Sequence, residues 1–169
     1  IWSEWKEDTT DKMVKTTIEK LMESINEAKD LYHSLVLLVG PSDIRKETAI
    51  NEIAEKLDQQ PINLNLELSK CLLEMTNKKR ALKVAEKLDE IIAPFQEYAI
   101  LDFTEILFDI NLKQDPLVLL KRVSRNKTII ASWNGIIKNK KLTYAEPRHP
   151  EYRAYDTSDI QIIEMEKDS

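Results

Sequence analysis

The chain has 169 residues and a net charge of −5, with 42 % hydrophobic and 33 % charged residues. These values predict one folded domain with a buried core, and they exclude a disordered chain and a generally basic nucleic-acid-coating protein. Only two glycines occur where ordinary usage gives roughly a dozen, which weighs against a glycine-rich phosphate-binding loop.

Three features of the sequence bear on the cellular compartment. Cys71 is the only cysteine, so it has no partner for an intramolecular disulfide, and a reducing compartment is expected. The longest strongly apolar stretch, residues 35–39, is too short to span a bilayer, and the N-terminal residues lack the apolar region of a signal peptide. The sequence therefore predicts a cytoplasmic protein with no membrane partner.

Hydrophobic periodicity in the first part of the chain predicts helices alternating with strands. Steps of three and four residues between apolar positions mark helices, while a short apolar run closed by a turn marks a strand buried on both faces. The predicted elements are a helix over 13–28, a strand over 35–39, a helix over 49–57, a strand over 62–66, a short helix near 72 and a helix over 82–92.

The same patterns continue toward the C-terminus. The predicted elements are a strand over 98–102, a helix over 116–123, a strand over 128–133, a hairpin over 136–144 and a last strand over 160–163. Together they predict an α/β three-layer sandwich whose mostly parallel sheet is flanked by helices, with an N-terminal helix and a C-terminal hairpin. We expect one domain, made of an N-terminal helical segment (1–32), an α/β core (33–135) and a segment with the hairpin, a loop and the last strand (136–169).

The turn after the first predicted strand partly matches a phosphate-binding loop of P-loop NTPases, G-x-x-x-x-G-K-[ST]. Gly40 and Lys46 stand at the expected positions, but Arg45 replaces the second glycine and Glu47 replaces the magnesium-binding hydroxyl. Thr48 follows one residue late. The candidate nucleotide-binding residues are Gly40, Pro41, Ser42, Arg45, Lys46 and Thr48. A plain strand-to-helix turn with a solvated lysine remains the alternative.

Two further strands of the predicted core end in polar residues. Asp102 ends an apolar run, as does the aspartate that follows a buried strand in P-loop NTPases and holds the magnesium ion. We expect Asp102 to bind this metal together with Thr48. Glu105 is the candidate for activating an attacking water, and Asn134 for sensing a terminal phosphate. The alternatives are a loop cap at Asp102 and a simple turn at Asn134. A P-loop NTPase-type fold would bring these residues to one edge of the sheet.

The region from Lys121 to Lys141 is basic and has no acidic residue. Arg125 is a candidate catalytic arginine that reaches a nucleotide in a neighbouring subunit, which would require a homo-oligomer, and Arg122 is a second candidate. The basic residues also form a candidate surface for double-stranded DNA or a protein partner. Ordinary solvated cations on a helix end and at a hairpin tip are the alternative. The candidate DNA or partner residues are Arg122, Lys138, Lys140, Lys141, His149 and Tyr152, the last two in a proline-containing loop.

The stretch from Leu101 to Tyr155 resembles the BrxF family of type 3 bacteriophage-exclusion (BREX) defence systems. The residues that carry the resemblance are LDFTEILFD, LKQDPLVLLKRVSRNKTIIASWNG and LTYAEPRHPEYRAY. The resemblance implies a P-loop NTPase-like fold that acts with other BREX proteins. Family members typically have an intact phosphate loop, and this chain departs from it at Arg45 and Glu47.

Three functions follow as expectations. The first is a BREX accessory subunit with a degenerate phosphate loop, which acts mainly through protein contacts. The second is an active ATPase that binds ATP with magnesium and uses Lys46, Asp102 and Glu105. The third is a DNA-contacting adaptor that uses the basic residues 121–141. No cofactor is expected if the loop is inactive.

Overall fold

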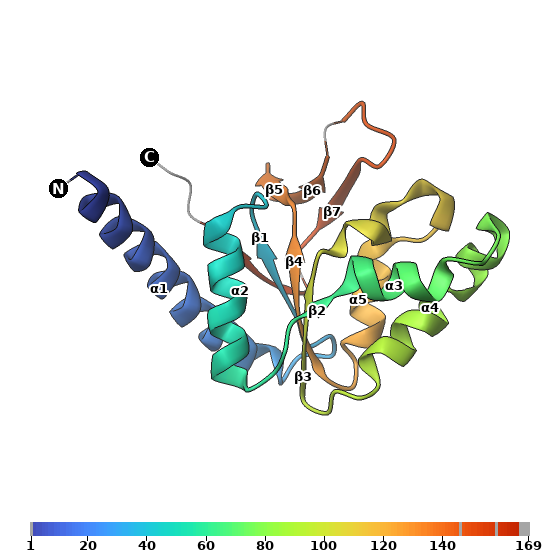
Figure 1. Ribbon diagram of the computed structural model, residues 1–169, viewed down its shortest axis with the longest axis horizontal. Helices are drawn as coiled ribbons and strands as arrows, with labels where there is room; N and C mark the ends of the chain where they lie inside the picture. Colours follow the sequence, from blue (N-terminus) through green and yellow to red (C-terminus); the bar gives the residue numbers. More distant parts are fainter. Residues whose placement is uncertain (1, 146, 158, 166–169) are drawn as a thin grey trace.

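The computed structural model describes residues 2–145, 147–157 and 159–165, and the side chains of residue 12 and of those from residue 14 onward in these ranges. Helices gather on both sides of a central sheet, and a smaller sheet lies beyond one end of it (Figure 1). The elements are α1 (Trp2–Ala28), β1 (Leu35–Val39), α2 (Ile44–Leu57), β2 (Ile62–Asn63), α3 (Leu64–Leu72), α4 (Asn77–Ile92), β3 (Tyr98–Asp102), η1 (Thr104–Phe108), η2 (Ile110–Leu112), α5 (Pro116–Val123), β4 (Thr128–Trp133), β5 (Gly135–Lys138), β6 (Lys141–Tyr144), β7 (Arg153–Asp156) and β8 (Gln161–Glu164).

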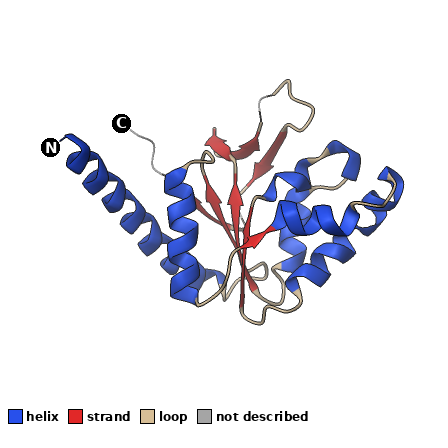
Figure 2. Cartoon of the chain, in the orientation of Figure 1, coloured by secondary structure: helices blue, strands red, loops and turns tan. Residues whose placement is uncertain are grey.

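The central sheet has five parallel strands in the order β2-β3-β4-β1-β8. Figure 2 shows helices on either side of the strands. Every residue of β1 and β4 is buried, as their unbroken apolar sequences predict. Alternate residues of β1 enter two separate cores. Val36 and Leu38 pack with α1 and α2, while Leu35, Leu37 and Val39 pack with α3, α4 and α5. The mixed α/β fold with a mostly parallel sheet between helices is therefore confirmed.

The predicted strand over 62–66 is wrong beyond its first two residues. Helix α3 starts at Leu64 because the Asn63 side chain caps it, accepting a hydrogen bond from the Leu66 backbone N–H at 3.0 Å. Buried Leu64, Leu68 and Leu72 repeat every four residues, which is a helical spacing. In the sheet, β4 lies between β1 and β3, the strand that ends at Asp102.

The smaller sheet is antiparallel, in the order β5-β6-β7, and its hairpin β5–β6 matches the predicted one. Strand β7 was not expected from the sequence. Trp133 at the end of β4 ties this sheet to the core, because its indole Nε1–H donates to Thr143 O at 3.0 Å. The ring of Tyr144 stacks on that of Phe108, with centroids 3.6 Å apart. The last strand, β8, returns to the main sheet beside β1.

Among the described residues, no helix is long and apolar enough to cross a membrane.

Candidate functional site

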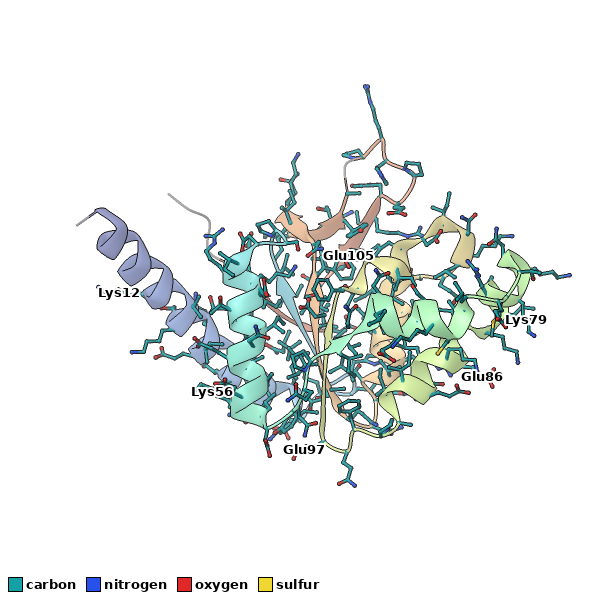
Figure 3. All side chains as sticks on the ribbon, viewed as in Figure 1. Lys12, Lys56, Lys79, Glu86, Glu97 and Glu105 are labelled. Atoms are coloured by element: carbon teal, nitrogen blue, oxygen red, sulfur yellow. The ribbon has the colours of Figure 1, made fainter. Side chains whose placement is uncertain are left out.

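The carboxyl ends of β1, β3 and β4 bring three of the predicted residues into one hydrogen-bonded chain. The ammonium group of Lys46, at the start of α2, donates to Gly40 O at 3.1 Å and to Asn134 Oδ1. The Asn134 amide in turn donates to Glu105 Oε1. Figure 3 shows Glu105 in the middle of the molecule, between the two groups of helices. Sequence reasoning thus selected residues that meet, although they are far apart along the chain.

Lys46 is unusually buried for a lysine, with 4 % of its surface exposed. Burial lowers its pKa from 10.5 to about 8, against the opposing effect of the Asp102, Glu105 and Asp43 carboxylates, which favour the charged form. The solvated-lysine interpretation of this position is therefore wrong. The amine is held by a backbone carbonyl and an amide of this chain, rather than exposed toward solvent.

Asp43 occupies the N-terminus of α2. Its Oδ1 accepts hydrogen bonds from the backbone N–H groups of Arg45 at 3.0 Å and Lys46 at 3.2 Å. Its Oδ2 accepts one from the Arg45 guanidinium at 2.9 Å. Burial acts to raise the pKa of Asp43, but the hydrogen bonds from Arg45 and from the Lys46 amide outweigh it and lower that pKa. Free amides at a helix N-terminus are the groups with which a phosphate loop holds its ligand.

The loop does not fit a magnesium nucleotide in this arrangement. The Asp43 carboxylate accepts hydrogen bonds from backbone amides that a phosphate would need, and the side chain of Glu47, where the motif has a hydroxyl, is exposed. The hydroxyl of Thr48 donates to Ile44 O at 2.7 Å, within the helix. Asp102 accepts from the Phe103 backbone N–H at 2.9 Å, as a loop cap does. No group of three or more His, Cys, Asp or Glu residues in the described part of the chain could hold a metal ion.

The remaining loop residues have other neighbours. A Cβ at Gly40 would lie 2.9 Å from the Cβ of Met165, so the close approach of the residue after β8 accounts for this glycine. Ser42 is exposed, and Pro41 lines a cavity. The glycine that matches the phosphate-loop pattern thus has a packing reason that involves no ligand.

The basic residues fall into two groups at opposite ends of β4. Before the strand, Arg122 forms an ion pair with Asp89, and Arg125 lies over the Tyr32 ring, 4.9 Å from its centroid. Lys121 pairs with Asp159 at 2.9 Å, and the Lys127 ammonium donates to Ile92 O and Phe95 O. Lys138, Lys140 and Lys141 follow the strand, at the β5–β6 tip. The structure does not join the two groups into one surface.

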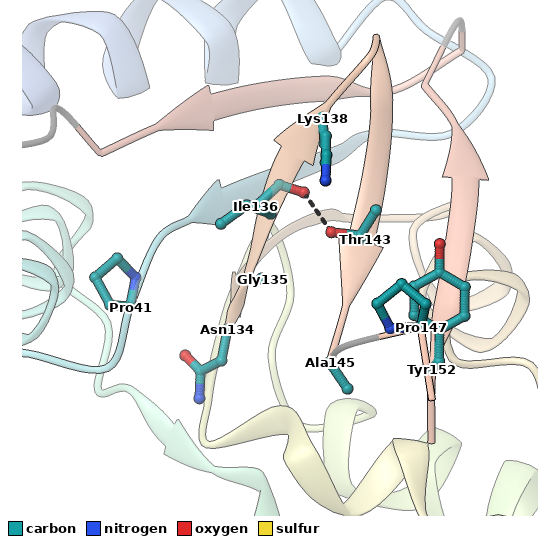
Figure 4. A pocket seen from close by; sticks show the side chains of 9 residues that line it. All are labelled: Pro41, Asn134, Gly135, Ile136, Lys138, Thr143, Ala145, Pro147 and Tyr152. Atoms are coloured by element: carbon teal, nitrogen blue, oxygen red, sulfur yellow. Dashed lines mark hydrogen bonds between the residues drawn. The ribbon is translucent and has the colours of Figure 1, made fainter. Parts of the chain in front are cut away.

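The sequence did not predict a cavity of about 480 Å³ between the loop after β1 and the small sheet. It is shown in Figure 4 and is lined by Pro41, Asn134, Gly135, Ile136, Lys138, Thr143, Ala145, Pro147 and Tyr152. Tyr152, a predicted partner residue, is in its wall. His149 accepts a hydrogen bond from the Glu151 backbone N–H at 3.0 Å and is not among the lining residues. Ile136, which is exposed and opposite Thr143 in the hairpin, also lines the cavity, and nothing in the sequence pattern indicated this.

Comparison with known proteins gives little similarity. No protein-family model and no curated protein matches the chain. The solved structure described as "Structure of C. elegans PCH-2" is similar, with a TM-score of 0.47 and 16 % sequence identity, over 98 % of this chain and 44 % of that one. The chain therefore spans less than half the length of that protein.

Proposed function

We propose that this chain is an accessory domain of P-loop NTPase type that does not use nucleotide and acts through protein contacts. The observation that carries the proposal is the Asp43 carboxylate, which binds the two backbone amides at the N-terminus of α2. A polyphosphate needs the same amides, and it would meet the negative charge of this carboxylate. A carboxylate of the chain itself therefore occupies the amides that would otherwise bind a phosphate.

Nucleotide binding would require several contacts to break together. Asp43 would have to leave the amides and its ion pair with Arg45, and loss of such a helix cap costs about 1 kcal/mol. Lys46 would have to leave Gly40 O and Asn134, and leaving buried hydrogen-bonding groups unsatisfied costs about 1–3 kcal/mol. The side chain of Arg45 also stands where the motif has glycine. These costs act together against nucleotide affinity.

The partners we propose are other proteins of a BREX phage-defence system. This part of the proposal depends on the resemblance over Leu101–Tyr155, and the self-capped loop supports a role as a subunit rather than as an independent enzyme. Co-expression with the other proteins of such a system, followed by purification of the complex, tests it directly. Failure of this chain to co-purify with any of them would contradict the BREX assignment.

An active ATPase is the second candidate, favoured by the contacts that link Lys46, Asn134 and Glu105. Calorimetric titration of ATP with magnesium separates the two candidates. We expect no saturable heat from the unaltered protein, and none from Lys46→Ala. Micromolar binding that Lys46→Ala abolishes, with turnover that Glu105→Gln abolishes, would contradict the proposal and establish the ATPase.

A repaired loop is the positive control for this titration. The triple variant Asp43→Ala, Arg45→Gly and Glu47→Ser removes the competing carboxylate and restores the glycine and the hydroxyl of the motif. We expect it to bind the nucleotide at least tenfold more tightly than the unaltered chain. If affinity stays unchanged although the variant is folded by circular dichroism, the self-capping contacts are not what prevents binding.

A further inference from the structure

The small sheet has one face in the core and one face outside it. Ile137, Leu142 and Tyr155 are neighbours across the three strands and pack against the core. The alternate residues Ile136 and Thr143 therefore lie on the outer face. Ile136 is 47 % exposed, although its side chain is large and apolar. The outer face thus carries one large apolar side chain, Ile136, that is about half exposed.

The cavity of about 480 Å³ lies on this outer face, between Ile136 and Pro41 of the loop after β1 (Figure 4). Carbon-rich groups form much of its wall, because Pro41, Ile136, Ala145 and Pro147 all line it. The Thr143 hydroxyl is already engaged, donating to Ile136 O at 3.0 Å. Cavities of this size and character bind apolar groups that a few polar contacts orient.

The β5–β6 tip brings lysines to one part of the cavity wall. Lys138 lines it, and the exposed Lys140 and Lys141 follow at the β5–β6 tip. Among the described residues, these three lysines form no ion pair. Asp156 of β7 is opposite Lys141 in the sheet, so the tip carries a net positive charge within a chain whose net charge is −5. Such a local charge favours an anionic partner.

From these features we infer that the outer face of the small sheet binds an acidic peptide segment of a partner protein, with one apolar side chain of that segment in the cavity. The inference rests on the proposed function and specifies the surface through which the chain makes its protein contacts. Strand β5 is an edge strand, so its main chain can pair with an extended peptide. The phosphates of a nucleic acid could neutralise the charge of the lysines. Its phosphate backbone, however, has no apolar side chain that could fill the cavity.

Selection from a random twelve-residue peptide library on the purified, full-length protein tests the inference. We expect the enriched peptides to carry net negative charge and an aliphatic or aromatic residue. They should bind the triple variant Lys138→Glu, Lys140→Glu and Lys141→Glu at least tenfold more weakly, and Ile136→Ser also more weakly. Enrichment of neutral or basic peptides, or no enrichment over uncoated resin, would overturn the inference.

A matched variant separates this surface from overall charge. Lys78→Glu, Lys79→Glu and Lys113→Glu changes three other exposed lysines and alters the net charge by the same amount. We expect it to bind the selected peptides like the unaltered chain, and equal weakening in the two triple variants contradicts a specific surface. Duplex DNA that competes with these peptides would also contradict the peptide assignment. Because nucleotide titration does not depend on these lysines, the proposed function and this inference can fail separately.

Discussion

Asp43 and Lys46 are joined by a hydrogen bond between the Asp43 carboxylate and the Lys46 backbone. Oδ1 of Asp43 accepts a hydrogen bond from the Lys46 backbone N–H at 3.2 Å, while the Lys46 ammonium donates to Gly40 O and Asn134. The carboxylate therefore caps the N-terminus of α2, and the amine binds the first residue of the loop, Gly40. Both groups that would recognise phosphate already have partners within the chain.

Removing the cap should destabilise the fold. We expect Asp43→Ala to lower the free energy of unfolding by about 1 kcal/mol, because two backbone amides of α2 lose their acceptor. Asp43→Asn keeps a side-chain oxygen and should cost less. Urea denaturation of the three proteins at pH 7 measures the difference. Equal stability of all three would show that the Asp43 side chain does not hold the helix in solution.

The stability contributed by Lys46 should increase with pH. Its pKa is about 8 when folded and near 10.5 when unfolded, so between these values the unfolded state binds more protons, and raising the pH favours the folded state. Relative to Lys46→Met, the unaltered chain should gain about 1 kcal/mol of unfolding free energy between pH 7 and pH 9. Denaturant titrations at both pH values measure this gain.

Two partly buried tyrosines do not affect stability within this pH range. Burial raises the pKa of Tyr144 and of Tyr155 in the folded state. Their contribution to the free energy of unfolding is therefore lost only as the pH approaches and passes about 10, where tyrosines of the unfolded chain ionise. A constant difference between the unaltered chain and Lys46→Met from pH 7 to pH 9 would contradict the burial of an ionisable amine at this position.

A methyl group at Gly135 should disrupt the small sheet. A Cβ there would lie 1.8 Å from Thr143 O and 2.8 Å from the Trp133 indole nitrogen, and backbone cannot move aside cheaply. We expect Gly135→Ala to cost about 3 kcal/mol of unfolding free energy and to shift the Trp133 indole N–H resonance. An unchanged indole resonance in a stable variant would contradict the close packing of β5 on β6.

The hairpin tip offers a gain in stability. Asn139 and Lys140 both have positive φ, 52° and 62°, as in the two-residue turns that favour Asn-Gly. Lys140→Gly should therefore raise the free energy of unfolding by about 1 kcal/mol. Lys138→Gly, within strand β5, is the matched control and should lower it by about 0.5–1 kcal/mol. Thermal melts of both variants and of the unaltered chain measure these changes in stability. A loss of stability in Lys140→Gly would contradict the turn geometry.

Much of the fold could be predicted because its strands are short, apolar and closed by turns. The pattern failed at 62–66, where alternation of Ile62, Leu64 and Leu66 resembled a strand although the capping oxygen of Asn63 starts a helix. Strand β7 was missed since three of its four residues are polar or small and it pairs only at the edge of the small sheet. Edge strands carry little hydrophobic signal.

The sequence predicted which residues lie at the candidate site, but it did not predict the hydrogen bonds that they form there. Parallel strands place Lys46, Glu105 and Asn134 at one edge of the sheet, which their spacing could indicate. The spacing could not indicate that Asp43 folds back onto the amides of Arg45 and Lys46, since that depends on the loop conformation. The cavity beside Pro41 also escaped prediction, because two segments more than ninety residues apart in the sequence form its walls.

The central claim is that the α2 amides are already occupied, and nuclear magnetic resonance of those amides tests it most directly. Magnesium ATP is added to millimolar concentration while the backbone N–H resonances of Arg45 and Lys46 are followed. The account predicts that neither resonance shifts in the unaltered chain, and that both shift in the variant Asp43→Ala, Arg45→Gly and Glu47→Ser, where residue 45 is glycine. A saturable shift of both resonances in the unaltered chain would contradict it.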